Sequence, residues 1–357
     1  ASGNVAVGSL AGQAITTGHS QTALGFCALT TATTPEGNTA LGNSALKLTT
    51  TGADNTAVGR RALCTNTTAG SNVAVGAYSM CLNTTGAANV AAGNQSLNVN
   101  TTGASNVAIG YNALCANTTG TCNTAIGRGA LDSATTGNCN TGVGANALGT
   151  GVLTGVENSA VGTSSLQKVT SGNSNSAIGH GSGLCITSGS NNLTLGYLSG
   201  RSSSPSGEIS TGSNNVVLGD DSISNLFCAD TSISSSDLRD KTDIEDFTHG
   251  LDFVTKLNPK TYRWDKRSWY TTNDDQSILD VTPDGSKKRN KKHIGFLAQD
   301  VLALEKEIGF ANDRDDMLVV NQTEDETRYG LKYERLVPML VNAIKELTAR
   351  VKELENE

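Results

Sequence analysis

The first two thirds of the chain repeat one pattern of polar, small and bulky apolar positions. A five-residue phrase, NTAVG or a close variant, begins thirteen times, at steps of 17 residues with one step of 18 and an insertion before the last copy. The copies begin at Asn4, Gln21, Asn38, Asn55, Asn72, Asn89, Asn106, Asn123, Asn140, Asn158, Asn175, Asn192 and Asn215. Because no helical or heptad period has this spacing, the pattern indicates a stack of repeated coils.

Each position of the 17-residue unit predicts a local structure. The third residue is nearly always alanine and the fourth is apolar and usually bulky, as in Ala57 and Val58. This alternation predicts a short strand with a small row on one face and a bulky row on the other, both buried. The fifth residue is always glycine, which suits a positive φ or a close backbone approach. An Ala or Ser at the eighth position and a later NTTG turn complete one coil of a parallel β-solenoid, or β-roll.

Stacking such coils predicts a rod. Equivalent residues of neighbouring strands lie about 4.8 Å apart, so thirteen coils extend on the order of 60 Å. The leading asparagines are expected to form a ladder of amide hydrogen bonds from coil to coil. The rows of alanine and serine are predicted to be the surface where chains pack, three around one axis. The pattern resembles the head repeats of trimeric bacterial adhesins and the shafts of phage fibres.

Other functions for this rod have little support in the sequence. Residues 1–235 contain eight acidic residues, scattered except for Asp220 and Asp221, so a glycosidase carboxylate pair is not indicated. Threonine rows on solenoids can bind ice, but the threonines here are adjacent, and only one row can face outward. The NTT sequences at Asn66, Asn83, Asn100 and Asn117 are interpreted as corners of the coil.

The cysteines are expected to be free thiols. Cys64, Cys81 and Cys115 share one repeat position, and Cys122 and Cys139 share another. Neighbouring coils would bring Cys64 near Cys81, but parallel stacking gives poor geometry for a disulfide. No C-x-x-C spacing occurs, so neither zinc nor any other metal or cofactor is predicted.

Composition narrows the possible partners. The net charge of -7 and a pI near 5.2 argue against binding to nucleic acid, because phosphates require a basic face. No apolar run is long enough to insert into a membrane, and the first residues do not resemble an export signal. With 40 glycines and 4% aromatic residues, one large globular core is not expected.

From Ser236 onward the chain has dense charge and both tryptophans, which indicates a separate small domain of mixed α and β structure. We expect a helix at 248–257, strands at 260–264 and 293–297 flanking a charged hairpin, a helix at 298–308, strands at 317–320 and 328–333, and a long final helix. In that helix Leu340, Ile344, Leu347, Val351 and Leu354 follow a coiled-coil spacing. The spacing favours oligomerisation, although a stripe packed on its own domain would have the same pattern.

Four motifs carry a family resemblance. They are SDLRDKTDI (236–244), LNPKTYRW (257–264), HIGFLAQDV (293–301) and YGLKYERLVPMLVNAIKEL (329–347). In this order they resemble the endosialidase-type intramolecular chaperone, the self-cleaving C-terminal domain of phage tailspikes, tail fibres and neck appendages. The resemblance implies a trimeric chaperone that directs assembly of the fibre and then releases itself.

The same resemblance implies the site of cleavage. The nucleophile falls on Ser236, the base on Lys241, and the scissile bond between Ser235 and Ser236. The family often has an apolar residue before the lysine, where this chain has Asp240. The spacing of Ser236 and Lys241 alone is no signal, because a serine-rich chain produces such pairs by chance.

Chemistry sets conditions on this dyad. A lysine deprotonates a serine only where burial or positive charge, here Arg239, lowers its pKa, whereas Asp237 and Asp240 oppose that change. We therefore expect a competent dyad only after folding and trimerisation; the alternative is that Lys241 is a solvated linker residue. His249, His293 and Glu305 are interpreted as structural.

The sequence thus predicts a mainly β protein with a trimeric solenoid shaft (1–235) and a chaperone and self-cleaving peptidase domain (236–357). The expected function is a phage tail fibre or tailspike segment for host attachment, located in the virion and made in the host cytoplasm. Its partners would be two further copies, the rest of the tail or baseplate, and a host receptor, which a glycan could provide. The alternatives are an adhesin-like protein without catalysis and a polysaccharide-degrading spike with its enzymatic domain upstream.

Overall fold

The computed structural model describes residues 2–223, 239, 241–270, 280–323 and 328–356. These residues belong to two compact units, which we call the shaft (Ala1–Ser222) and the C-terminal unit (Ile223–Glu357). The predicted boundary between Ser235 and Ser236 lies outside the described residues. Each unit is described by itself below.

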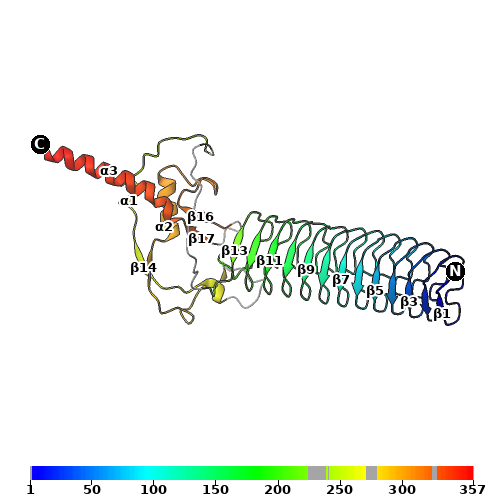
Figure 1. Cartoon of the computed structure of the whole chain (residues 1–357). Coiled ribbons are helices and arrows are strands. Elements are labelled where there is room, and N and C mark those ends of the chain that lie inside the picture. The colour runs from blue at the N-terminus through cyan, green and yellow to red at the C-terminus, as the bar shows by residue number, and fades with distance from the viewer. Residues whose placement is uncertain (1, 224–238, 240, 271–279, 324–327, 357) are drawn as a thin grey trace. The chain divides into compact units, whose positions relative to one another are not determined.

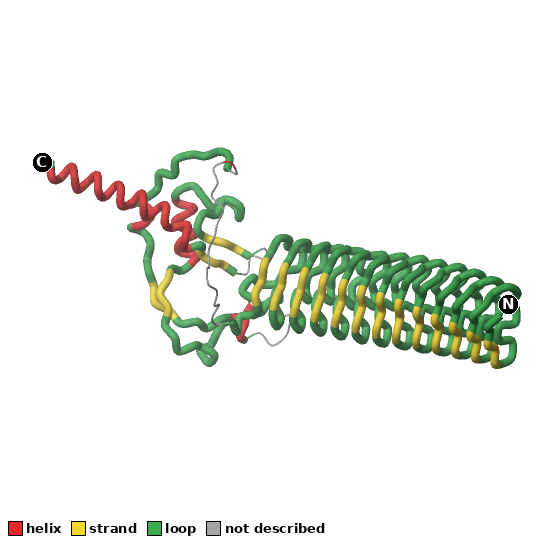
Figure 2. The backbone as a smooth tube through the Cα atoms, in the orientation of Figure 1, coloured by secondary structure: helices red, strands yellow, loops and turns green. Residues whose placement is uncertain are grey.

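The shaft is a parallel β-solenoid, as the repeat predicted. Thirteen three-residue strands form one sheet in sequence order, so each strand pairs with the next coil (Figure 1). In Figure 2 these strands lie in a row along one side of the stacked coils. The strands are β1 (Val5–Val7), β2 (Thr22–Leu24), β3 (Thr39–Leu41), β4 (Thr56–Val58), β5 (Val73–Val75), β6 (Val90–Ala92), β7 (Val107–Ile109), β8 (Thr124–Ile126), β9 (Thr141–Val143), β10 (Ser159–Val161), β11 (Ser176–Ile178), β12 (Leu193–Leu195) and β13 (Val216–Leu218).

In the single chain only one face of this sheet is buried, whereas the sequence predicted that both are. Pairing joins equal repeat positions, for example Ala57 with Ala74 and Val58 with Val75. From β2 onward the central alanines are fully buried inside the coil, whereas bulky fourth residues such as Val75 point outward and are exposed. The interior is filled from the opposite wall by residues such as Leu131, whose side chain lies against Gly142, the glycine that replaces the central alanine of β9.

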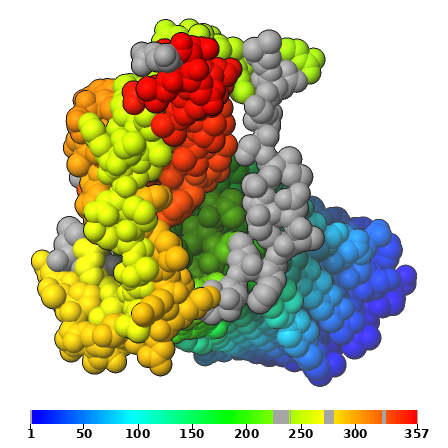
Figure 3. Space-filling model, turned by 90° about the vertical axis from the view of Figure 1, so that its left-hand side faces the viewer, coloured from blue at the N-terminus to red at the C-terminus, as the bar shows by residue number. Residues whose placement is uncertain are grey.

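The small-residue rows are therefore not the surface between chains, and that prediction was wrong. Ala57 at the third position and Ala62 at the eighth are both inaccessible in a single chain, because they pack inside their own coil. Five serines at the eighth position are buried in the same way, and one of them, Ser79, shares a hydrogen bond with Ser96 of the next coil. A close approach of small residues takes place within the solenoid instead. Figure 3 shows the solenoid in space-filling form, with its coils in continuous contact.

The glycine at the fifth position of the repeat has both a positive φ and a close backbone neighbour, the two features that the sequence suggested. Gly110 has φ +129°, and a Cβ atom on it would lie 2.6 Å from the carbonyl oxygen of Gly127 in the next coil. Gly93 has the same relation to Gly110, with a distance of 2.3 Å. Any side chain at this corner would separate the coils, since only glycine combines this φ with this spacing.

Two ladders of buried asparagines join the coils. At the first position, Asn72 Oδ1 accepts hydrogen bonds from the backbone N–H of Asn89 (2.9 Å) and from its amide nitrogen (3.2 Å). The predicted ladder is thus confirmed. The asparagines of the NTT corners form a second ladder, in which Asn100 Nδ2 donates to Asn83 Oδ1 at 2.7 Å. Apart from Asn4 and Asn215 at the two ends of the row, both rows are buried and serve the stacking.

The threonine rows also have a structural role. The first threonine of each pair donates to a carbonyl oxygen of the next coil, as Thr84 Oγ1 does to Thr101 O at 2.8 Å. The second, such as Thr85, is exposed. One row alone faces outward, as expected from adjacent threonines.

The C-terminal unit is a small α+β unit. It contains the helices and strands that the sequence predicted, but their ends differ from the predicted ones. Its elements are α1 (Leu251–Val254), β14 (Lys260–Tyr262), the 3-10 helix η2 (Arg267–Trp269), β15 (His293–Gly295), α2 (Ala298–Glu307), β16 (Val320–Gln322), β17 (Tyr329–Leu331), the 3-10 helix η4 (Tyr333–Arg335) and α3 (Leu336–Glu355). Strands β14 and β15 form one antiparallel pair, and β16 and β17 form another. The core gathers Phe253, Val301, Val319, Val320, Leu336 and Met339.

Candidate processing site

The predicted dyad is only partly within the described residues. Ser235, Ser236, Asp237 and Asp240 lie outside them, whereas Arg239 and Lys241 are described and exposed. A lysine amine acts as a base only where burial or neighbouring positive charge lowers its pKa. The single chain leaves Lys241 exposed, so burial of its amine would have to come from another copy or from residues outside the described set.

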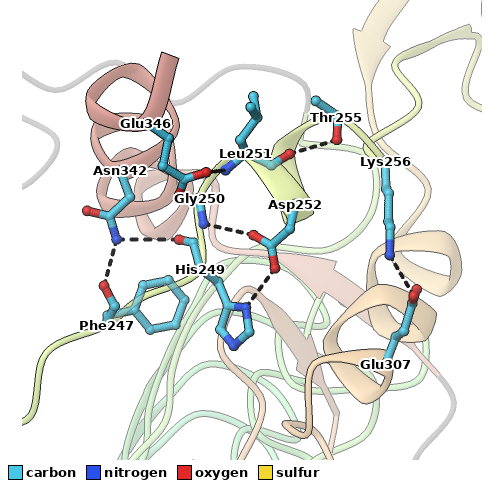
Figure 4. A network of polar contacts seen from close by, with 10 residues as sticks. All are labelled: Phe247, His249, Gly250, Leu251, Asp252, Thr255, Lys256, Glu307, Asn342 and Glu346. Atoms are coloured by element: carbon cyan, nitrogen blue, oxygen red, sulfur yellow. Dashed lines mark hydrogen bonds and ion pairs between the residues drawn. The ribbon is translucent and has the colours of Figure 1, made fainter. Parts of the chain in front are cut away.

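The segment that follows Lys241 is fastened to the final helix by backbone contacts, drawn in Figure 4. Asn342 Nδ2 donates to the carbonyl oxygen of Phe247 at 2.6 Å and to that of His249 at 3.4 Å. Glu346 Oε2 accepts the backbone N–H of Leu251 at 3.2 Å. We call this set of contacts the clasp. It places the chain a few residues beyond Lys241 directly on α3.

Gly250 lets the two segments come this close. A Cβ atom at Gly250 would lie 2.7 Å from the backbone nitrogen of Ala343 and 2.4 Å from Glu346 Oε1. The clasp therefore depends on a glycine at this position, because any side chain would push the segment away from α3. Spacing along the sequence could not have revealed these contacts, since about 95 residues separate the partners.

His249 has the structural surroundings that the sequence analysis proposed. Its Nδ1 lies 2.9 Å from Asp252 Oδ2, and its ring packs edge-on against Phe247 and Phe310. The hydrogen bond with His249 lowers the pKa of the Asp252 carboxyl, and the N–H of Gly250 adds to the effect. This pair orders the turn into α1 (Figure 4).

Glu305 and His293 likewise have structural contacts. The fully buried carboxylate of Glu305 accepts the backbone N–H groups of Leu318, Val319 and Val320 at 2.6–3.0 Å, which holds the approach to β16 on α2. The ring of His293 stacks on Tyr262 across the β14–β15 pair, with centroids 5.7 Å apart. Neither arrangement involves Lys241.

Helix α3 has two apolar faces. Met339 and Ala343 are buried, and the helix packs against α1. The residues of the predicted coiled-coil stripe face away from this core and are exposed, with Ile344 63% accessible. They are Leu340, Ile344, Leu347, Val351 and Leu354. The stripe does not pack on its own domain, which favours the interpretation that it contacts other helices.

A separate cluster on the shaft combines thiols and positive charge. Cys64 and Cys81 are buried neighbours in adjacent coils, and Arg61 extends over the ring of Tyr78 beside them. A hydrogen bond from the Cys81 thiol, helped by the Arg61 guanidinium, lowers the pKa of Cys64 to about 6 although burial opposes it. The same contact raises the pKa of Cys81, so the pair shares one negative charge.

This arrangement predicts a thiolate at neutral pH. The ultraviolet absorbance of thiolates can be measured while the native protein is titrated with base. It should rise by one thiolate per chain in a step centred near pH 6. Above that pH Cys64 is charged, and below it the thiol is protonated. The substitution C64S should remove the step, and R61Q should move it to higher pH.

The matched control is C115S, at the same repeat position. Burial and the charge of Asp132 raise the pKa of Cys115, so its removal should leave the step unchanged. A first thiolate appearing only above pH 8 would contradict the assignment.

The described part of the chain has neither a cluster of metal-ligating side chains nor a membrane-spanning helix. Among those residues, no group of three or more His, Cys, Asp or Glu side chains is arranged to hold a metal ion. None of their helices is long and apolar enough to cross a membrane.

One region of the chain matches a known protein family. Residues 236–310 match the model of the peptidase S74 family, described as chaperone of endosialidase. The match begins at the serine of the SDLRDKTDI motif and extends beyond α2. No curated protein and no solved structure matches the chain significantly.

Proposed function

We propose that this chain is a segment of a phage tail fibre or tailspike, in which the chaperone-of-endosialidase region aligns three shafts and then releases itself by autoproteolysis. The observation that carries the proposal is the family match at residues 236–310, which follows directly on a repeat shaft. A self-cleaving chaperone joined to a β-solenoid supports a tail fibre or tailspike function. The proposal includes attachment to a host surface receptor, for which a glycan is the candidate, and connection to the baseplate.

The shaft supplies the physical need for a chaperone. Its strands pair at equal repeat positions through thirteen coils of nearly the same sequence. If two chains associated one coil out of step, each side chain would meet an equivalent residue, and contacts would be lost only at the ends. Register between chains is thus weakly specified by the shaft. A folded unit at one end sets it before long-range pairing, the slow step, begins.

The proposed cleavage needs only groups of the chain and water. The Ser236 hydroxyl, deprotonated by the Lys241 amine, attacks the carbonyl carbon of Ser235. The C–N bond breaks, the Ser236 nitrogen takes the proton, and Ser235 is left as an ester on Ser236 Oγ. Water hydrolyses the ester and gives a new carboxylate at Ser235 and a free hydroxyl and amine at Ser236.

The geometry of the C-terminal unit supports a coupling between assembly and cleavage. Lys241 is exposed in the single chain, and the clasp connects the segment after it to α3. The apolar stripe of α3 remains open for other copies. Association through α3 would therefore act on the segment that carries the lysine. Such an order prevents cleavage before the chaperone has completed its role.

A comparison of two expressed chains tests the chaperone role. The full chain should give soluble, aligned trimers of the shaft, whereas a chain that ends at Ser235 should give mostly aggregates and misaligned species. Mass in solution and electron microscopy of rod length distinguish these products. Equal yields of aligned trimers from both chains would disprove the chaperone role.

A further inference from the structure

The outward face of the shaft sheet is an apolar surface without a partner in the single chain. The second and fourth residues of each repeat point outward, on either side of the buried central residue. Two such positions on each of thirteen strands give 26 residues, which we call the outer stripe. It contains only Val, Ile, Leu, Ala, Thr and Ser. Its large residues are well exposed, with Ile109 41% and Ile178 55% accessible.

The surroundings of the outer stripe resemble those of a protein interface. No charged side chain lies within the outer stripe, but exposed charged side chains lie along both of its edges. Asp54 and Glu157 precede the strands, and Arg60 and Arg128 follow them. An apolar centre with a polar rim is typical of surfaces that bind protein. Its 26 residues match the roughly 20–30 that one side of a stable interface contributes. Soluble monomers rarely expose a continuous apolar surface of this extent.

The period of the outer stripe identifies its occupant. Apolar groups recur at each coil, about every 4.8 Å, over all thirteen strands. A partner that covers the whole stripe must present apolar groups at the same spacing and over the same length. Another copy of this chain, running in the same direction and in register, meets this condition by construction. No other segment of the chain has this repeat.

We infer that the outer stripe is the contact between copies of this chain, which lie side by side with equal coils at equal height and enclose an apolar axis. The number of copies, three, rests on the proposed function. Each copy presents a face only three residues wide, about 10 Å. Equal height on such an axis places Ile109 of one copy beside Ile109 of the next. The exposed apolar residues on the other walls of the coil remain in contact with water.

Hydroxyl-radical footprinting of the assembled full chain tests the inference within one sample. Ile109 and Ile126 lie on the outer stripe, whereas Leu82 lies at another repeat position and is 43% accessible in the single chain, nearly the same as Ile109. The stripe residues should lose most of their labelling relative to the denatured chain, and Leu82 should keep it. The mass in solution should be that of three chains. Equal labelling of Ile109 and Leu82, or protection in a species with the mass of one chain, would overturn the inference.

Substitutions give an independent measurement. The double variant I109D/I126D should lower the trimeric fraction of the shaft severalfold, because carboxylates would meet on the apolar axis, whereas L82D should leave it at the wild-type value. Equal loss in both variants would refute the outer stripe as the contact. Cleavage, scored by electrophoresis of the same samples, reports separately on the proposed function. A cut chain with a fully labelled stripe contradicts only the present inference, and an uncut chain with a protected stripe contradicts only autoproteolysis.

Discussion

Replacing Ser236 by alanine should leave the chain at its full length of 357 residues, whereas the unaltered protein should separate into residues 1–235 and 236–357. Alanine has no hydroxyl to attack the carbonyl carbon of Ser235. In a serine protease the loss of the nucleophile or of its base lowers the rate roughly a millionfold. The variant K241A should behave in the same way. Denaturing electrophoresis and the mass of the smaller fragment measure the result.

The control for this experiment is K288A. Lys288 is another exposed lysine of the C-terminal unit, so its removal changes charge to the same extent without affecting the proposed dyad. K288A should be cut as the unaltered chain is. Circular dichroism of all variants checks that the C-terminal unit has folded. A folded, trimeric wild-type protein that stays intact would show that this chain has the folding role without the protease.

The substitution G110A should open the shaft locally. Its Cβ atom would lie 2.6 Å from the carbonyl oxygen of Gly127, a distance that real Cβ atoms do not reach, and φ is +129°. Backbone strain alone costs about 1–3 kcal/mol, and separation of the coils adds lost hydrogen bonds. Because each coil contacts only its neighbours, the loss should be confined to β7, β8 and the adjacent coils. Hydrogen exchange of their amides should accelerate by about tenfold or more, the equivalent of 1.4 kcal/mol.

The matched control for this variant is G3A, in the same solenoid. Gly3 also has a positive φ (+68°), but its nearest neighbour would lie 3.8 Å from the new Cβ atom. In G3A a side chain enters a positive-φ position without a clash between coils. If G110A and G3A changed exchange by the same amount, close stacking would not be the reason for the glycine column.

The elements of both units could be predicted because their signals are local. The 17-residue period, the invariant glycines and the leading asparagines each require a particular coil geometry, and the structure has the glycine corners and the asparagine ladder that they predicted. In the C-terminal unit the heptad spacing of Leu340 and Ile344 predicted α3 and its stripe. Motif resemblance located the chaperone region, which the family match confirms over residues 236–310.

The orientation of the sheet could not be predicted. Alternation along β4 places Ala57 and Val58 on opposite faces of the sheet. It does not say which of the two faces points into the coil. The structure resolves this through Leu63 and its equivalents, which have positive φ (+49° for Leu63) and point into the coil. Such a conformation costs about 1–2 kcal/mol, and burying the leucine offsets it by about 1.5–3 kcal/mol. With leucine filling the interior, only a small residue such as alanine fits opposite.

The sequence by itself determined the coil, its period, its glycine corners and the presence of a second unit that ends in an amphipathic helix, because these follow from neighbours along the chain. Tertiary structure alone decided which face of the sheet is open and that the segment after Lys241 is held on α3 by Asn342 and Glu346. The physical reason is the same in both cases. Closing a coil, or closing the clasp over about 95 residues, sets side-chain directions through packing between distant segments, which no local pattern encodes.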